Sequence, residues 1–325
     1  MFLIEIYTRC GLGLPRPGGK AKTPNLGFIR ARSSAGEHLG DIEGVVGSNP
    51  TAPTIPPEGE KPLAKTKHKP KTHFEERATA AMGEHLPAPD WSLRQKLALT
   101  ARMLAAEEHG SGLAGQITAR GDAAGTLWTA RFGLGFEEIR AADFILVDGD
   151  LNVLSGGGMA NPSNRFHLWI YNARPDVNCI VHTHPPYCSA LSMIGVPLEA
   201  AHMDTSMFYE DCAWLPEWPG PPIGDEEGEL IATALADKNS ILLAHHGQLA
   251  AAATVEEAAI RALFIERAAR LQLLAMGAGT IQPLPPEAGR EAHDYRLRPA
   301  PLNATFHYHA RLVLRDQPEC LEEDG

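Results

Sequence analysis

The sequence predicts a single-domain α/β fold in which helices cover a central sheet. Two observations support this prediction. Short apolar segments of strand character, such as 178–182 and 240–244, alternate irregularly with helical segments along the chain. The longest helical segment, 255–276, begins after the capping residue Thr254 and carries Glu256 and Glu257 in its first turn, where the helix dipole favours acidic groups. Irregular alternation of this kind favours a sheet packed against helices.

The elements of the first half follow in order. An amphipathic helix is predicted over 89–109, with Asp90 or Ser92 as its N-cap and an apolar stripe that includes Leu97 and Met103. A glycine-rich turn over 110–115 leads into the remaining elements of this half. These are short strands at 116–120 and 126–130 and a hairpin-like pair over 144–154 around Asp148-Gly149.

The second half contains the other predicted elements. A helix over 165–172 is expected to stop before Pro175, because a proline disfavours helical geometry in the residue before it. The strand 178–182, helices over 189–194 and 228–236, the strand 240–244 and the helix 255–276 come next. The segment 302–314 either packs on the domain or frays.

Composition excludes several classes of protein. The formal net charge of −11 argues against a general nucleic-acid binder, because phosphate groups require a basic surface. The five cysteines are irregularly spaced and include no Cys-x-x-Cys, which favours free thiols and a reducing, cytoplasmic location. No apolar run approaches the roughly 18 residues that a membrane-spanning helix requires.

Residues 1–81 differ from the rest of the chain and are predicted to be a disordered or spurious extension. The run 61–72 is basic and broken by proline, which is typical of a disordered tail or of an arm that binds anionic surfaces. The stretch 30–54 resembles the translated product of a serine transfer-RNA gene. We therefore expect Met82 to be the true start.

Three histidines form the strongest functional signal. His182 and His184 are separated by one residue at the end of an apolar strand, so their side chains point to the same face. His246 follows a second apolar strand and could complete the set. Three neutral imidazoles suit Zn²⁺, Fe²⁺ or a similar divalent metal.

Five blocks of sequence together resemble the class II aldolase/adducin family. These are 115–120 (GQITAR), 132–143 (FGLGFEEIRAAD), 167–177 (HLWIYNARPDV), 182–187 (HTHPPY), and His246-Gly247 followed by Glu256-Glu-Ala. The resemblance spans about residues 90–280 and implies a domain over 88–285 with a C-terminal extension over 286–325. It also implies a mixed sheet sandwiched between helices and a homotetramer whose active sites lie near subunit interfaces.

The resemblance also implies a metal site. In aldolases of the family the matching histidines hold Zn²⁺, which stabilises an enediolate, and here they are His182, His184 and His246. Iron(II) or manganese is the alternative metal. His245 is an alternative third ligand, and His202 is a further candidate in another segment.

The sequence departs from the family pattern at the catalytic acid. The position nineteen residues before His182 holds Ser163, whose hydroxyl cannot serve as a carboxylate base. The features that would bind a phosphate are also partly lost at Gly115, Gln116 and Arg131, which we predict to be substrate-binding residues together with Ser163. Arg131 either binds a carboxylate or is a solvated surface residue.

The segment 202–218 is rich in methionine and aromatic residues. Tyr209 is the candidate proton donor, and Glu210 or Asp211 the candidate replacement for the missing acid. The alternative is that these side chains serve only core or interface packing.

The sequence therefore predicts a divalent-metal-dependent lyase, of aldolase or decarboxylase type, for a small and non-phosphorylated hydroxy or oxo acid. Two alternatives stay open. One is a non-haem iron oxygenase or decarboxylase on the same scaffold. The other is a non-catalytic, adducin-like interaction protein, against which the presence of all three histidines counts.

Overall fold

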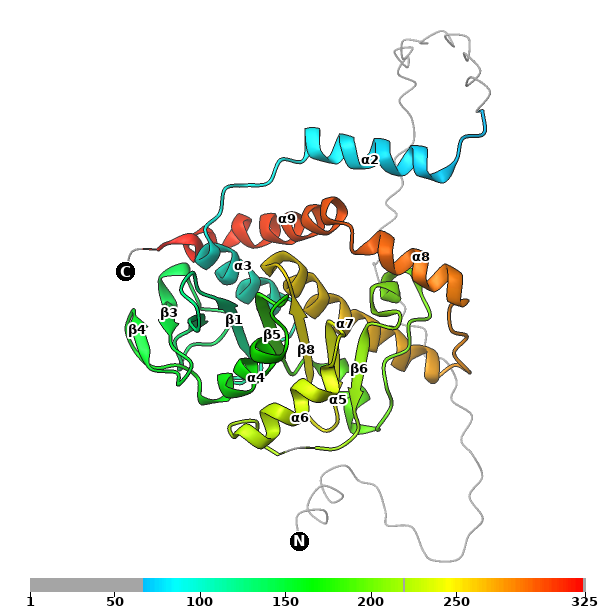
Figure 1. The fold of residues 1–325 in the computed structure, drawn as a ribbon. Coiled ribbons are helices and arrows are strands. Elements are labelled where there is room, and N and C mark those ends of the chain that lie inside the picture. The colour runs from blue at the N-terminus through cyan, green and yellow to red at the C-terminus, as the bar shows by residue number, and fades with distance from the viewer. Residues whose placement is uncertain (1–66, 219, 324–325) are drawn as a thin grey trace, which may run out of the picture. The chain divides into compact units, whose positions relative to one another are not determined.

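The computed structural model describes residues 67–218 and 220–323, and their core is one eight-stranded sheet (Figure 1). The strand order is β4-β3-β2-β1-β5-β8-β7-β6. The strands are β1 Gln116–Arg120, β2 Leu127–Ala130, β3 Phe144–Val147, β4 Val153–Ser155, β5 Cys179–Thr183, β6 Cys212–Leu215, β7 Ser240–Leu243 and β8 Gln248–Ala252. All neighbouring strands run antiparallel except β6 and β7, which run parallel. The sheet is therefore mixed, as predicted.

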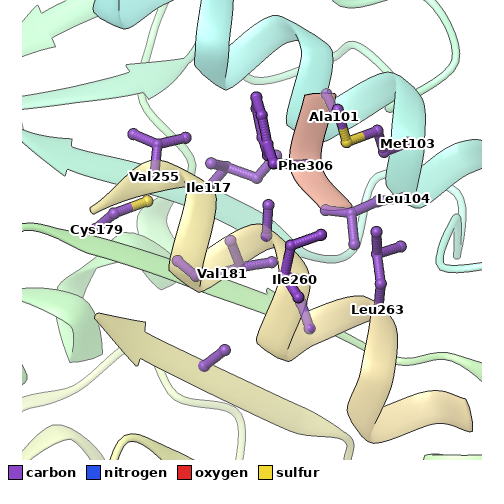
Figure 2. Packing of buried hydrophobic residues seen from close by; sticks show 14 of the residues in the cluster. Ala101, Met103, Leu104, Ile117, Cys179, Val181, Val255, Ile260, Leu263 and Phe306 are labelled. Carbon is purple, nitrogen blue, oxygen red and sulfur yellow. The ribbon is translucent and has the colours of Figure 1, made fainter. Parts of the chain in front are cut away.

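Helices cover both faces of this sheet. The helices of the described residues are α2 Lys71–His85, α3 Leu93–Ala106, α4 Arg165–Ala173, α5 Pro186–Met193, α6 Asp225–Leu235, α7 Val255–Met276, α8 Pro286–Arg296 and α9 Pro299–Asp316, of which α2 buries no residue. One apolar cluster joins a sheet face to α3, α7 and α9, and Figure 2 shows Ile117 and Val181 of the sheet near Ile260 and Phe306 of these helices. A second cluster joins the other face to α4 and α6. Because successive strand residues point to opposite faces, the strands alternate between the two clusters.

The structure confirms the ends predicted for α7 but shortens the helix predicted over 89–109 at both ends. Ser92, and not Asp90, caps α3: its hydroxyl accepts a hydrogen bond from the backbone N of Gln95 at 3.2 Å. The Gln95 side chain accepts a bond from the backbone N of Ser92 in return, which completes a capping box. Thr254 caps α7, which spans the predicted residues.

Three elements, β8, β6 and α8, were not predicted from the sequence. The residues of β8 are mostly alanine, which is rare in strands, but the sheet buries all five of them. The strand β6 has only four residues, and α8 is largely polar. The segment 302–314 packs on the domain, which was one of its two predicted alternatives, because α9 buries Phe306 and Ala310 completely against the core.

The prediction of disorder is wrong for residues 71–81, which lie in α2. This helix is rich in alanine and glutamate, which favour helices, and no residue of it is buried. Residues 1–66, including the stretch that resembles a transfer-RNA product, lie outside the described residues. Among the helices described, none is long and apolar enough to cross a membrane.

Candidate metal centre

Three histidines meet at one end of the sheet; His182, His184 and His246 are called the histidine cluster below. His182 lies in β5, His184 follows that strand, and His246 lies in the turn between β7 and β8. One ring nitrogen from each lies within 4.8 Å of the others. The Nε2 atoms of His182 and His184 are 3.0 Å apart. The strand alternation that predicted a shared face for this pair therefore agrees with the structure.

Backbone geometry brings the third histidine into place. His245 is exposed and adopts a left-handed conformation with φ of 56°, which turns the chain sharply after β7. Gly247 follows the cluster residue His246. A Cβ atom at Gly247 would press on the backbone O of Thr183 and lie 2.7 Å from Cδ2 of His184. The structure thus brings His246, and not His245, to the other two histidines.

Burial keeps the cluster uncharged. Burial, together with the neighbouring His246 and His184, holds the pKa of His182 well below its ordinary value. Burial also lowers the pKa of His184. Burial and the charge of His184 lower the pKa of His246 to about 4. Neutral imidazoles are the form that binds metals, so the cluster is ready to bind one near neutral pH.

The donor set fits a divalent metal. His182 Nδ1 lies 2.8 Å from the backbone carbonyl oxygen of Gln248, to which it donates, and this leaves the Nε2 lone pair free. Nδ1 of His246 is buried and has no hydrogen-bond partner among the described residues. In a tetrahedral zinc site, ligand nitrogens lie about 3.3 Å apart, close to the observed separation of the His182 and His184 nitrogens. In the described part of the chain, the cluster includes no carboxylate.

Two predicted substrate-binding residues lie beside the cluster. Gln116 of β1 pairs directly with His182 of β5, so the two side chains share a face of the sheet. The Oε1 atom of Gln116 is buried without a hydrogen-bond partner in the described part of the chain. A Cβ atom at Gly115 would lie 3.1 Å from the backbone O of His182, so only glycine allows the chain to approach this closely. Both residues line a small hollow with Arg131 and Asn161.

Arg131 is largely committed to another partner. Its Nε and Nη2 atoms lie 3.0 and 2.9 Å from Oδ1 of Asp143, a buried carboxylate that also accepts a bond from the backbone N of Arg140. This ion pair neutralises the arginine charge. Arg131 is therefore not a free carboxylate binder, because it already pairs with Asp143. It is not a fully solvated residue either, because it lines the hollow.

Ser163 lies in the segment that leads into α4, the helix that packs against His182. It belongs to the 3₁₀ helix Pro162–Asn164, which leads directly into α4, and its backbone N donates to Oδ1 of Asn161 at 3.0 Å. Phe166, one helical turn later, packs edge-on against His182 with 5.1 Å between ring centroids. The contact of Phe166 thus connects the segment of Ser163 to the cluster, and a role for the serine in substrate binding stays a prediction.

Tyr209 and Glu210 do not reach the cluster within the chain. Both precede β6, whose first residue Cys212 pairs with Ser240 at the start of β7, whereas the cluster lies beyond the end of β7. The residues therefore occupy opposite ends of the sheet. The Tyr209 ring packs against Gly289 of α8, and Glu210 pairs with Arg290 at 2.8 Å. The catalytic roles of Tyr209 and Glu210 stay predictions, because one chain by itself does not bring these side chains to the cluster.

Asp211 and His202 also have structural roles. Asp211 lies 2.8 Å from Nη1 of the buried Arg261. His202 is exposed and accepts a bond from the backbone N of Asp204. Met207 and Phe208, from the same segment, are buried in the core, which agrees with the prediction that this segment serves packing.

Sequence reasoning missed the residues that form hydrogen bonds with His182 and with its neighbour Thr183. Gln248 accepts from His182 through its backbone carbonyl, and its side-chain Nε2 donates to Oγ1 of Thr183 at 2.6 Å. His109 also bonds Thr183, with 2.8 Å between Nδ1 and Oγ1. A backbone carbonyl leaves no signal in the sequence, and β8 itself was not predicted.

Comparisons with known proteins agree with this geometry. The family described as Class II Aldolase and Adducin N-terminal domain matches residues 95–273. The 4-hydroxy-3-prenylphenylpyruvate oxygenase/4-hydroxy-3-prenylbenzoate synthase of Streptomyces roseochromogenus subsp. oscitans is 34% identical over 182 residues. The match covers 55% of this chain and 66% of that relative, which is just under two thirds of its length.

Two further relatives extend the comparison. The Decarboxylase NovR of Streptomyces niveus is 33% identical over 182 residues, which are 55% of this chain and 67% of the relative. The solved structure of L-fuculose 1-phosphate aldolase from Glaciozyma antarctica PI12 is similar with a TM-score of 0.66 and 27% identity, over 75% of this chain and 99% of that chain. The chain described here therefore belongs to the class II aldolase and adducin family.

Proposed function

We propose that this protein is a divalent-metal-dependent enzyme that cleaves or forms a carbon–carbon bond beside a hydroxyl or carbonyl group. The single observation that carries the proposal is the histidine cluster, which presents three neutral imidazoles at the end of the sheet. Zinc is the proposed metal, because a three-histidine set suits its tetrahedral preference.

His182, His184 and His246 would hold the metal. When bound, such a metal acts as a Lewis acid that stabilises negative charge developing on a substrate oxygen. The hydrogen bond from His182 Nδ1 to the Gln248 carbonyl orients that ring. The unpartnered Oε1 atom of Gln116 is available on the same face to accept a bond from a substrate hydroxyl.

The proposed substrate is a small, non-phosphorylated hydroxy or oxo acid. A phosphate would need free positive charge, but the guanidinium of Arg131 is already neutralised by Asp143. Ser163 replaces the carboxylate that aldolases of the family use, so decarboxylation, in which carbon dioxide leaves, is favoured over a standard aldol cleavage. The Streptomyces niveus relative, which is named a decarboxylase, supports this choice.

A non-haem iron oxygenase is the second candidate. Imidazole ligands also suit iron, and the Streptomyces roseochromogenus relative, which carries the name of an oxygenase, favours this candidate. The intact histidines count against a non-catalytic, adducin-like interaction protein. We further propose a cytoplasmic homotetramer.

Reconstitution with single metals separates these candidates. The protein is loaded with Zn²⁺ or, without oxygen, with Fe²⁺, and is screened against 2-oxo and 2-hydroxy acids by mass spectrometry. Turnover of the zinc form without oxygen supports the lyase, and oxygen consumption by the iron form alone supports the oxygenase. If neither form turns over any acid, and only phosphorylated sugars react, the proposed substrate class is wrong.

A further inference from the structure

A buried polar network lies behind the histidine cluster, on the opposite face of the sheet. Thr183 stands between His182 and His184, so its side chain points away from them, toward α3. Its Oγ1 atom lies 2.8 Å from Nδ1 of His109 and accepts from Nε2 of Gln248 at 2.6 Å. His109, Thr183 and Gln248 are each completely buried.

The end of α3 fixes His109 in this place. The backbone N of Glu108 donates to the carbonyl of Ala105, and the backbone N of His109 donates to that of Leu104 at 2.9 Å. This is the Schellman pattern, which requires a left-handed residue. Glu108 fills that position with φ of 63°, where glycine would be favoured. The left-handed backbone of Glu108 is strained, and it places His109 in its buried position. Strain of this kind is kept only where the surrounding structure holds the residue in place.

The hydrogen bonds at Thr183 are complementary. Its oxygen accepts from the Gln248 amide, and its own hydrogen is free to be donated to Nδ1 of His109. Burial lowers the pKa of His109 to about 3, so the ring stays neutral and its Nδ1 can accept. Gln248 also accepts from His182 through its backbone carbonyl, which links the network directly to the cluster.

We propose that His109 is a positioning residue for the metal centre: by holding Thr183 from behind, it fixes the strand segment that carries His182 and His184. This inference rests on the proposed metal site and extends it to a residue that touches neither metal nor substrate. Groups that hydrogen-bond a metal ligand directly typically account for a 10–100-fold change in metal affinity, and His109 acts on the ligands through the intervening Thr183.

The test compares His109→Phe, which removes the hydrogen bond, with His109→Asn, which restores a polar atom near the position of Nδ1. Zinc affinity is measured by competition with a chelator, and the Co²⁺ form is examined by visible absorption, which reports ligand geometry. His109→Phe is expected to weaken zinc binding roughly 10–100-fold and to shift the Co²⁺ bands. His109→Asn is expected to recover most of both.

Thr183→Val serves if the phenylalanine variant does not fold, because valine keeps the volume of threonine and loses only the hydroxyl. Thr183→Val should weaken zinc binding to the same extent as His109→Phe. The double variant should bind zinc no more weakly than either single variant. His307→Phe is the matched control, since His307 is also a buried histidine but lies in α9, against Trp91.

Wild-type affinity and wild-type Co²⁺ bands in His109→Phe or Thr183→Val would overturn the inference, as would an equal loss in His307→Phe. Fully additive losses in the double variant would overturn it too. A wild-type chain that binds no metal would instead overturn the proposed function, which separates the two failures.

Discussion

Nδ1 of His182 lies 2.8 Å from the backbone carbonyl oxygen of Gln248, and this bond joins two neighbouring strands at the point where the histidine cluster forms. The register of β5 and β8 pairs His182 with Leu249 and Thr183 with Gln248. The sheet itself therefore sets the orientation of the ring, and a metal would meet a ligand that is already oriented.

We predict that Gly247→Ala weakens metal binding more than tenfold. The new methyl group would contact the backbone O of Thr183 and lie 2.7 Å from Cδ2 of His184, so one ligand must move. Overpacking of this kind also costs about 1–3 kcal/mol of the free energy of unfolding. Zinc titration and urea unfolding measure the two effects. Gly149→Ala is the control, because nothing lies within 4 Å of its added Cβ, and equal behaviour of both variants would refute the prediction.

We predict that Tyr209→Phe leaves zinc affinity unchanged. The hydroxyl belongs to a ring packed against Gly289 of α8, at the opposite end of the sheet from the cluster. The measurement is the same chelator competition, with His184→Ala as the positive control. A marked loss of affinity in Tyr209→Phe would show that this tyrosine reaches a metal centre after all, which it could do only in another subunit.

The buried pair Arg261–Asp211 is predicted to matter for stability and not for metal binding. Its atoms lie 2.8 Å apart, and the Arg261 side chain is 1% exposed. Asp211→Asn removes one of the two carboxylates that pair with Arg261, the other being Glu257 at 2.8 Å, and should lower the free energy of unfolding by about 1–3 kcal/mol. The exposed pair Arg267–Asp204 is the control, where Arg267→Gln should cost less than about 1 kcal/mol. Similar losses in urea unfolding would contradict this account.

The metal-free protein is predicted to lose stability in mild acid. Burial lowers the pKa values of His109 and His167 to about 3, below the ordinary value of 6.5. The unfolded chain then binds protons more readily than the folded one, so the stabilisation is complete above about pH 6.5 and is lost as the pH falls toward about 3. For each of the two histidines, the free energy of unfolding should fall by about 2 kcal/mol between pH 7 and pH 5. Urea unfolding at both pH values measures this loss, and equal stability would contradict it.

The sequence was most informative where chemistry and periodicity coincide. The His182–His184 pair was predictable because strand alternation puts both rings on one face, and α7 was predictable from the Thr254 cap. The position of Tyr209 within the chain was not predictable, because its distance from the cluster depends on the pairing of β6 with β7, a contact that no local pattern encodes. The alanine-rich β8 was not predicted for a related reason. Its burial between the helices on the two faces of the sheet, and not the strand propensity of its residues, makes it a strand.

The most direct test of the central claim is the metal content of the protein and of its histidine variants. The wild-type protein, dialysed against trace zinc, iron and manganese, is analysed by plasma mass spectrometry beside His182→Ala, His184→Ala and His246→Ala, with the exposed His245→Ala as control. We predict one divalent metal per chain in the wild type and in His245→Ala, and a loss of most of it in each cluster variant. A wild-type chain without metal, or cluster variants that keep the full amount, would contradict the account.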